Sequence, residues 1–229
     1  DHNSTLTVFP LDKSLAHIEE QAYGGKVETD YGLFSASGNM KFQESLYLEV
    51  QVTGNFFNGT KGRRSEHKTT LRAINHVINH DDEERSINRY IKLPVTNVNI
   101  FTQLTAARIC TLLKKAAGYN EMSHTITDIY RNASEQALKE VLTAFSISDI
   151  YVSMLSIDPT RASFSQYNAP ASMMAAVSNI LLTSVDEELL DTFFTEWDKD
   201  FAPDGRIDNE DIKESIRDGQ QSLKYTNVY

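Results

Sequence analysis

The sequence contains a single cysteine, Cys110, so it forms no intrachain disulfide bond, and a secreted fold stapled by several disulfides is excluded. The lone thiol favours a reducing compartment or a particle assembled there. The five prolines and ten glycines are scattered, and no repeat or low-complexity tract occurs, so no flexible linker divides the chain. We therefore expect one domain over residues 1–229.

Long apolar runs are also absent. The most apolar stretch, residues 173–182, is interrupted by Ser178 and Asn179, and no run approaches the roughly 20 residues needed to cross a bilayer. We expect a soluble protein without membrane insertion. The first residue is Asp1 rather than Met, and the opening residues lack the basic and apolar regions of a signal peptide, so we interpret this end as processed or trimmed.

The motifs of common enzyme classes are missing too. The sequence has no Gly-x-Ser-x-Gly elbow, no glycine-rich phosphate loop and no dinucleotide fingerprint. Cys110 lies in the mostly apolar segment 104–113, which favours a buried structural thiol over a nucleophile. These absences favour a protein that is not an enzyme.

Strand patterns dominate the N-terminal part. Residues 27–33 and 40–52 alternate apolar or β-favouring residues with polar ones, which is the period of half-buried strands. The two segments predict an antiparallel hairpin. We also expect a long exposed loop over 54–70, a short helix over 71–78 and a third strand over 91–101.

Helical periodicity begins at Thr102. A first helix is predicted over 102–117, and the clearest one begins at Ser123, with apolar residues at three- and four-residue intervals. Pro170 is suited to start an apolar helix, and Asp186 to cap another that ends at Trp197.

Strands that precede helices without alternation are typical of an α+β fold rather than a doubly wound parallel sheet. We therefore predict an N-terminal antiparallel β-hairpin or small sheet, in a β-rich part over 20–101. It packs against a C-terminal helical bundle over 102–229.

Charge is distributed unevenly along the chain, whose formal net charge is -10. Residues 186–211 hold eleven acidic residues against two basic ones, a local charge of -9. Residues 61–72 hold five basic residues against Glu66, a local charge of +4. This polarity predicts a molecule that binds a polyanion at one end and cations or a basic partner at the other.

The most specific local pattern lies over 190–216. An amphipathic helix with Phe193 and Trp197 is followed by spaced acidic residues, by Gly205 and by Ile207. This segment resembles an EF-hand, whose loop offers calcium six to eight oxygen ligands around a sharp glycine turn. The resemblance implies a calcium site with these ligands: Asp198, Asp200, Asp204, Asp208 and Asp211.

The spacing departs from the EF-hand pattern, because three residues separate Asp200 from Asp204 where one is usual. No second loop is visible to pair with it. The alternative is a capped turn between two surface helices, with Asp208 or Asn209 as the cap.

A second candidate site combines aromatic and basic residues. Aromatic faces beside cations suit single-stranded nucleic acid, because bases stack on the rings while phosphates bind the cations. The alternative is a basic loop that contacts an acidic protein surface. The residues are Phe56, Phe57, Lys61, Arg63, Arg64 and Lys68.

Together these observations favour a non-enzymatic binding or assembly protein. We expect a subunit of a larger complex or particle that contacts other protein chains, copies of itself included, through its basic loop and its acidic helical end. The alternatives are a protein that binds single-stranded nucleic acid and a calcium-binding module.

Overall fold

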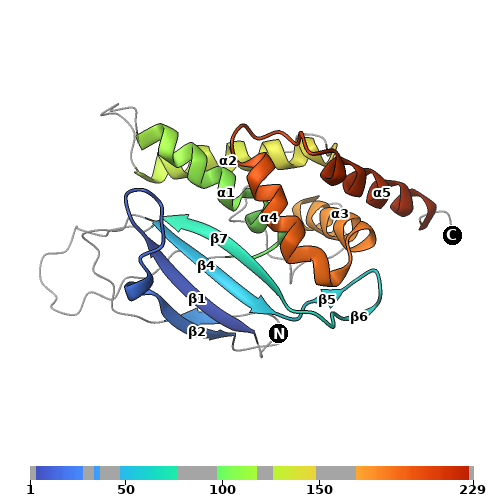
Figure 1. Ribbon diagram of the computed structural model, residues 1–229, viewed down its shortest axis with the longest axis horizontal. Coiled ribbons are helices and arrows are strands. Elements are labelled where there is room, and N and C mark those ends of the chain that lie inside the picture. The colour runs from blue at the N-terminus through green and yellow to red at the C-terminus, as the bar shows by residue number, and fades with distance from the viewer. Residues whose placement is uncertain are drawn as a thin grey trace, which may run out of the picture.

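The structure is a computed structural model that describes residues 4–27, 34–36, 47–76, 97–117, 126–147 and 169–226. An antiparallel sheet from the N-terminal part lies against helices from the C-terminal part (Figure 1). The predicted α+β class, with a small N-terminal sheet packed on a helical bundle, is confirmed. No helix in the described ranges combines the length and the apolar character needed to span a bilayer.

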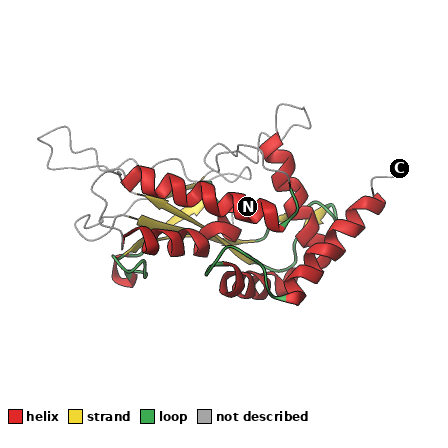
Figure 2. Cartoon of the chain, turned by 90° about the horizontal axis from the view of Figure 1, so that it is seen from above, coloured by secondary structure: helices red, strands yellow, loops and turns green. Residues whose placement is uncertain are grey.

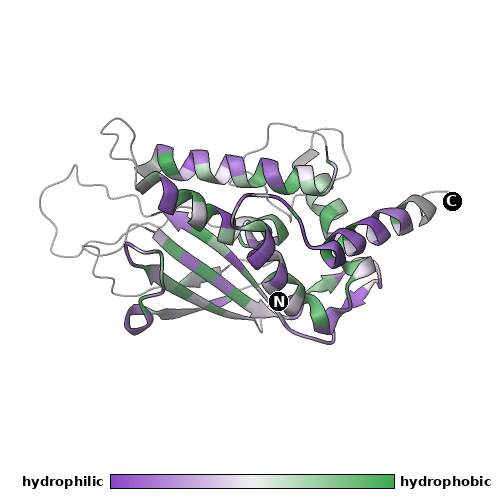
Figure 3. Ribbon diagram, turned by 45° about the horizontal axis from the view of Figure 1, so that its top comes forward, coloured by the Kyte–Doolittle hydropathy of each residue, from purple (hydrophilic) through white to green (hydrophobic). Residues whose placement is uncertain are grey.

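Five strands form the sheet in the order β3-β2-β1-β4-β7. All four pairings between neighbours are antiparallel, and Figure 3 shows hydrophilic and hydrophobic residues alternating across the strands. A separate two-stranded hairpin, β5–β6, lies in the chain segment that connects β4 to β7. The strands are β1 Thr5–Leu11, β2 Tyr23–Val27, β3 Phe34–Ala36, β4 Tyr47–Gly54, β5 Phe57–Asn58, β6 Arg63–Arg64 and β7 Thr69–His76.

The strand order corrects two predictions. Of the expected hairpin between 27–33 and 40–52, residues 28–33 and 40–46 lie outside the described residues; the described part over 47–52 belongs to β4 and pairs with β1 and β7 instead. The expected helix over 71–78 is also wrong: β7 pairs with β4 over eight residues, and this long-range pairing overrides the weak local helical pattern. β1, which the sequence patterns missed, contains Pro10, a residue that argues against a strand.

Within the described ranges, six helical segments follow the sheet, all in the C-terminal part. Figure 2 shows α5 beside α3, with the C-terminal end of α5 extending away from the sheet. They are α1 Ile100–Ala117, α2 Ile126–Ala144, α3 Ala169–Ser184, the short 3-10 helix η4 Glu187–Leu189, α4 Leu190–Phe201 and α5 Glu210–Thr226.

The start of α1 is fixed by a reciprocal cap. Asn99 Oδ1 accepts hydrogen bonds from the backbone N–H groups of Phe101 (2.9 Å) and Thr102 (3.1 Å), while Thr102 Oγ1 accepts one from the N–H of Asn99 (2.9 Å). The cap is therefore Asn99 rather than Thr102. Of the third strand expected over 91–101, residues 91–96 lie outside the described residues, and Ile100 already belongs to α1.

The main core forms among the helices. Trp197 is fully buried, and its indole Nε1 donates a hydrogen bond to the carbonyl of Leu104 (2.9 Å). The rings of Phe145 and Phe201 lie beside it, with centroids 5.8 Å and 4.9 Å away. This core anchors α4 against α1 and α2, and thereby fixes the acidic residues that α4 presents to β7.

Candidate interaction site

The basic segment begins on a well-ordered turn. Asn58 Oδ1 accepts hydrogen bonds from the N–H of Thr60 (3.0 Å), the hydroxyl of Thr60 (2.7 Å) and the N–H of Lys61 (3.1 Å). Gly62 then takes the left-handed conformation, with φ of +63°, and lets the chain return into β6. The residues expected in a long loop are thus held on a defined hairpin.

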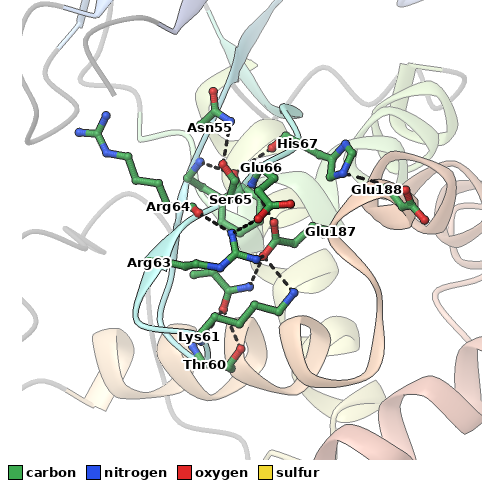
Figure 4. A network of polar contacts seen from close by, with 12 residues as sticks. Asn55, Thr60, Lys61, Arg63, Arg64, Ser65, Glu66, His67, Glu187 and Glu188 are labelled. Carbon is green, nitrogen blue, oxygen red and sulfur yellow. Dashed lines mark hydrogen bonds and ion pairs between the residues drawn. The ribbon is translucent and has the colours of Figure 1, made fainter.

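Glu187 joins this hairpin to the helical layer (Figure 4). It is the first residue of η4 and is only 6% exposed. Its carboxylate accepts hydrogen bonds from Asn58 Nδ2 (2.8 Å) and the N–H of Glu66 (2.9 Å), and it lies 3.2 Å from Lys61 Nζ. These contacts favour the ionised form and lower the pKa of Glu187 to about 2. The N–H of Glu66 contributes most to this shift, followed by Asn58 and Lys61.

The pairing of acidic with basic residues continues along both segments. Arg63 Nη2 lies 3.9 Å from Glu187, and Arg63 Nη1 lies 3.1 Å from Glu66. His67 Nε2 lies 4.0 Å from Glu188. The basic segment 61–72 therefore lies along the first part of the acidic stretch, and the expectation that they occupy opposite ends of the molecule is wrong.

Side chains of the helices α4 and α1 cover the outer edge of β7. Asp191 Oδ1 of α4 accepts the N–H of Thr70 (3.2 Å), and Gln103 Oε1 of α1 accepts the N–H of Arg72 (3.0 Å). These side chains satisfy backbone donors that an edge strand would otherwise leave open to pairing with another chain. Strand addition at this part of the edge is thereby blocked.

Asp198 on α4 is half-buried, with 21% of its side chain exposed, whereas Asp191 on the same helix is exposed. It forms an ion pair with Arg72, whose guanidinium also lies 4.0 Å from Glu49. Burial raises the pKa of Asp198 to about 6, and the neighbouring charge of Arg72 only partly opposes that effect. Asp198 thus holds its charge less firmly than Glu187, although both face cations of the basic segment.

The structure places the six residues of the predicted nucleic-acid site on or beside the hairpin, in different settings. Phe56 packs against the main core, whereas Phe57 is 68% exposed. Lys61 and Arg63 are ion-paired as described, and Arg64 and Lys68 are exposed. Lys61 and Arg63 are thus already partnered by carboxylates of the same chain.

A further residue at this corner, Leu189, was not identified from the sequence. Among the described residues the large hydrophobic side chains that are exposed are Phe57 and Leu189, the latter at 50%. Both belong to the segments that Glu187 joins, β5 and η4. A leucine in a short acidic helix carries no sequence signal of exposure, because one isolated apolar residue fits either side of such a helix.

The predicted calcium ligands are used differently by the structure. α4 continues past Trp197, where we expected it to end, to Phe201, so Asp198 and Asp200 are helical rather than part of a loop. Asp200 accepts the backbone N–H groups of Asp208 (2.8 Å) and Asn209 (3.1 Å). Within the described ranges, no group of three or more His, Cys, Asp or Glu side chains is arranged to hold a metal ion.

The segment over 202–209 has the contacts of a capped turn. Asp204 Oδ1 accepts the N–H of Arg206 (2.9 Å), and Asn209 Oδ1 accepts the N–H of Asp211 (2.9 Å) at the start of α5. Gly205 closes the turn after α4 in the left-handed conformation, with φ of +79°, and donates its N–H to the carbonyl of Phe201 (2.9 Å). These contacts match the alternative in which Asn209 caps the following helix, and calcium binding by the five aspartates remains a prediction.

Arg108 of α1 binds the α4–α5 turn through its guanidinium group. Its guanidinium donates to both carboxylate oxygens of Glu140 on α2 (2.7 and 2.9 Å) and to the carbonyls of Ala202 (3.1 Å) and Pro203 (3.0 Å). The bidentate contact leaves the arginine 4% exposed. The α4–α5 turn is therefore tied to both α1 and α2.

Cys110 is half-buried on α1. Burial raises the pKa of its thiol to about 11, so the thiol is protonated at neutral pH. The arrangement fits a structural role.

Comparison with protein-family models, with curated protein sequences and with solved structures finds no match.

Proposed function

We propose that this chain is a non-enzymatic binding or assembly protein that contacts another protein chain through the corner formed by β5, β6 and η4. We call this surface the hairpin corner, and its exposed members are Phe57, Arg63, Arg64, Glu188 and Leu189, with the exposed Lys68 following β6 in the chain. The observation that carries the proposal is the exposure of Phe57 and Leu189 on segments that one buried carboxylate joins.

The composition of the hairpin corner supports protein binding. Interfaces draw most of their binding energy from a few aromatic, arginine and aliphatic side chains at their centre. Phe57 and Leu189 supply apolar surface, and Arg64 supplies a planar donor beside it. Burying a fully exposed phenylalanine or leucine side chain contributes about 1.5–3 kcal/mol, and a partner that covers the exposed 68% of Phe57 and 50% of Leu189 gains roughly half to two thirds of that from each.

Rigidity supports the proposal as well. Glu187, Asn58 and the backbone of Glu66 hold the hairpin in one position, so binding would order few additional groups. A surface that is already ordered loses less conformational entropy when its partner binds.

The decisive experiment is a native mass measurement of the protein with whatever co-purifies, over a range of concentrations. We expect a complex, either of several copies or with another chain, that dissociates in Phe57→Ser/Leu189→Ser. Glu214→Ser/Gln221→Ser, at exposed positions on α5, is the matched control and should leave the complex intact. A wild-type protein that remains a monomer without a partner at every concentration would count against the proposal.

Single-stranded nucleic acid is the alternative partner, favoured by Arg64 and Lys68 beside the exposed ring of Phe57. Retention on an oligonucleotide column that decreases with salt and is lost in Arg63→Ala/Arg64→Ala would support this alternative. Absence of retention at low salt would eliminate it.

A further inference from the structure

An apolar cavity of about 440 Å³ lies between one end of the sheet and the helices α3 and α4. Its walls include Val52 of β4, Leu71 of β7, Met174 and Leu181 of α3, and Phe194 of α4. This volume lies within the range of roughly 300–1,000 Å³ that is typical of pockets for small organic ligands. The exposed ring of Phe57 is also part of the lining, so the cavity opens beside the hairpin corner.

Two polar groups in this apolar wall lack partners. Thr69 and Asn99 both line the cavity, and each is only 5% exposed. Among the described residues, neither Thr69 Oγ1 nor Asn99 Nδ2 has a hydrogen-bond partner. Buried polar groups are nearly always hydrogen-bonded in native proteins, so two such groups on one cavity require an explanation.

The orientation of the Asn99 amide is fixed by its other end. Asn99 Oδ1 accepts the N–H groups of Phe101 and Thr102 at the start of α1, so the amide nitrogen is the group left over. An amide nitrogen only donates hydrogen bonds, whereas the threonine hydroxyl can donate or accept. A molecule that pairs with both groups needs a hydrogen-bond acceptor.

The lining also limits the charge of that molecule. None of the described residues that line the cavity is acidic or basic. An ionised ligand would lose its hydration there without gaining a counter-ion, which is strongly unfavourable. An uncharged molecule with one acceptor group avoids this loss.

We propose that the cavity binds an uncharged apolar molecule carrying a carbonyl group, the chemical class of alkyl ketones and fatty-acyl esters. The alkyl part contacts the aliphatic and aromatic walls, and the carbonyl oxygen accepts hydrogen bonds from Asn99 Nδ2 and Thr69 Oγ1. Both polar atoms are covered by their neighbours in the structure, so binding requires the surrounding apolar side chains to shift and the threonine hydroxyl to rotate about χ1 to another staggered position.

The test uses 2-decanone as the probe and the full chain labelled with nitrogen-15. We expect saturable shifts of the Asn99 side-chain amide signals, because the carbonyl oxygen accepts their hydrogen bond. Decanoate and decylammonium, which have the same chain length but carry charge, should bind at least about tenfold more weakly.

Thr69→Val separates a binding role from a structural one. Removing an unpartnered buried hydroxyl should leave the melting temperature unchanged or raise it, whereas the affinity for 2-decanone should fall about tenfold. Thr143→Val, at an exposed position on α2, is the matched control and should leave that affinity unchanged. Ser178→Leu places a larger side chain in the wall of the cavity and should abolish binding.

Three results would overturn the proposal: no saturable binding of 2-decanone, equal affinity in Thr69→Val, or equal affinity in Ser178→Leu. None of them bears on the assembly experiment, which probes Phe57 and Leu189 by native mass, so the two proposals fail independently.

Discussion

The acidic stretch 186–211 consists of two parts that use the same kind of side chain in different ways. In the first part, Glu187, Asp191 and Asp198 face the basic segment and contact residues of β5, β6 and β7. In the second part, the carboxylates of Asp200 and Asp204 accept backbone N–H groups of the α4–α5 turn. The first part joins the two layers of the fold, and the second part shapes a local connection.

The difference shows that the count of charges does not define a binding surface. A local charge of -9 suggests a site for cations, but many of these carboxylates already have partners within the chain. The same holds for the basic segment, whose Lys61 and Arg63 face Glu187. The hairpin corner thus exposes the apolar side chains of Phe57 and Leu189 among charges of both signs.

Breaking the tie that holds the α4–α5 turn should have the largest effect. Arg108→Met removes the partner of Glu140 and leaves a half-buried carboxylate, so we expect the free energy of unfolding to fall by about 3 kcal/mol. Urea denaturation followed by the fluorescence of Trp197 measures this change. Arg108→Met/Glu140→Met should recover more than half of the loss, and a double variant as unstable as the single one would contradict the pairing.

Gly205 in the α4–α5 turn and Gly62 in the hairpin both take the left-handed conformation, so substituting each of them by alanine compares the two turns directly. A Cβ at Gly205 would lie 2.2 Å from Glu140 Oε2, whereas a Cβ at Gly62 would meet no atom within 4 Å. Gly205→Ala should therefore lower the free energy of unfolding by about 2 kcal/mol. Gly62→Ala introduces only backbone strain and should lower it by about 1 kcal/mol. Equal losses in thermal or urea denaturation would show that the contact with Glu140 is unimportant.

The raised pKa of Asp198 predicts a pH dependence of stability. Its folded pKa of about 6 exceeds the ordinary value of 3.8, so the folded state binds the proton more tightly than the unfolded state. The contribution is present below about pH 4 and is lost as the pH rises through about 6, by an amount on the order of 2 kcal/mol. Glu49 and Arg72 are the charged groups that face it.

Urea denaturation between pH 4 and 7 should show this decline in the wild type and not in Asp198→Asn. Glu196→Gln, on the same helix with 46% of its side chain exposed, serves as the control and should keep the wild-type profile. Identical profiles in the wild type and Asp198→Asn would rule out the titration of this group.

Glu187→Gln should loosen the hairpin without unfolding the protein. The variant removes the charge that faces Lys61 and Arg63, so we expect faster hydrogen exchange at the N–H of Glu66. The decrease of retention on an oligonucleotide column with salt should also become steeper, by the slope expected for one or two additional phosphate contacts. Glu188→Gln, whose carboxylate is exposed and 4.0 Å from His67, is the matched control. Unchanged exchange in Glu187→Gln would mean that the carboxylate does not hold the hairpin.

Calcium should have the smallest effect. Asp200 and Asp204 already accept backbone N–H groups, and Asp198 pairs with Arg72, so we expect millimolar calcium to leave the melting temperature unchanged within about 1 °C. A larger rise that chelation reverses would establish the calcium site that the EF-hand resemblance implies.

Part of the fold was predictable from the sequence. The helix predicted over 102–117 corresponds to α1, and the one predicted to begin at 123 corresponds to α2. The sequence also predicts, as the alternative to a calcium loop, a turn capped by Asp208 or Asn209, and Asn209 has the cap contact. These features depend on contacts between residues three or four positions apart, so a short window of sequence contains the relevant information. The strand order was not predictable in this way, because β4 meets β1 and β7 through distant pairings.

The sequence by itself determined the α+β class, the main helices, the lone thiol and the segregation of charge along the chain. Only the tertiary structure decided where those charges lie, because Asn58 and Glu187 are 129 positions apart and meet through the packing of the sheet on the helices. The cavity with Thr69 and Asn99 likewise exists only where strands and helices from both parts of the chain enclose it. Local periodicity specifies single elements, whereas burial and charge neutralisation between elements specify the surface that remains for a partner.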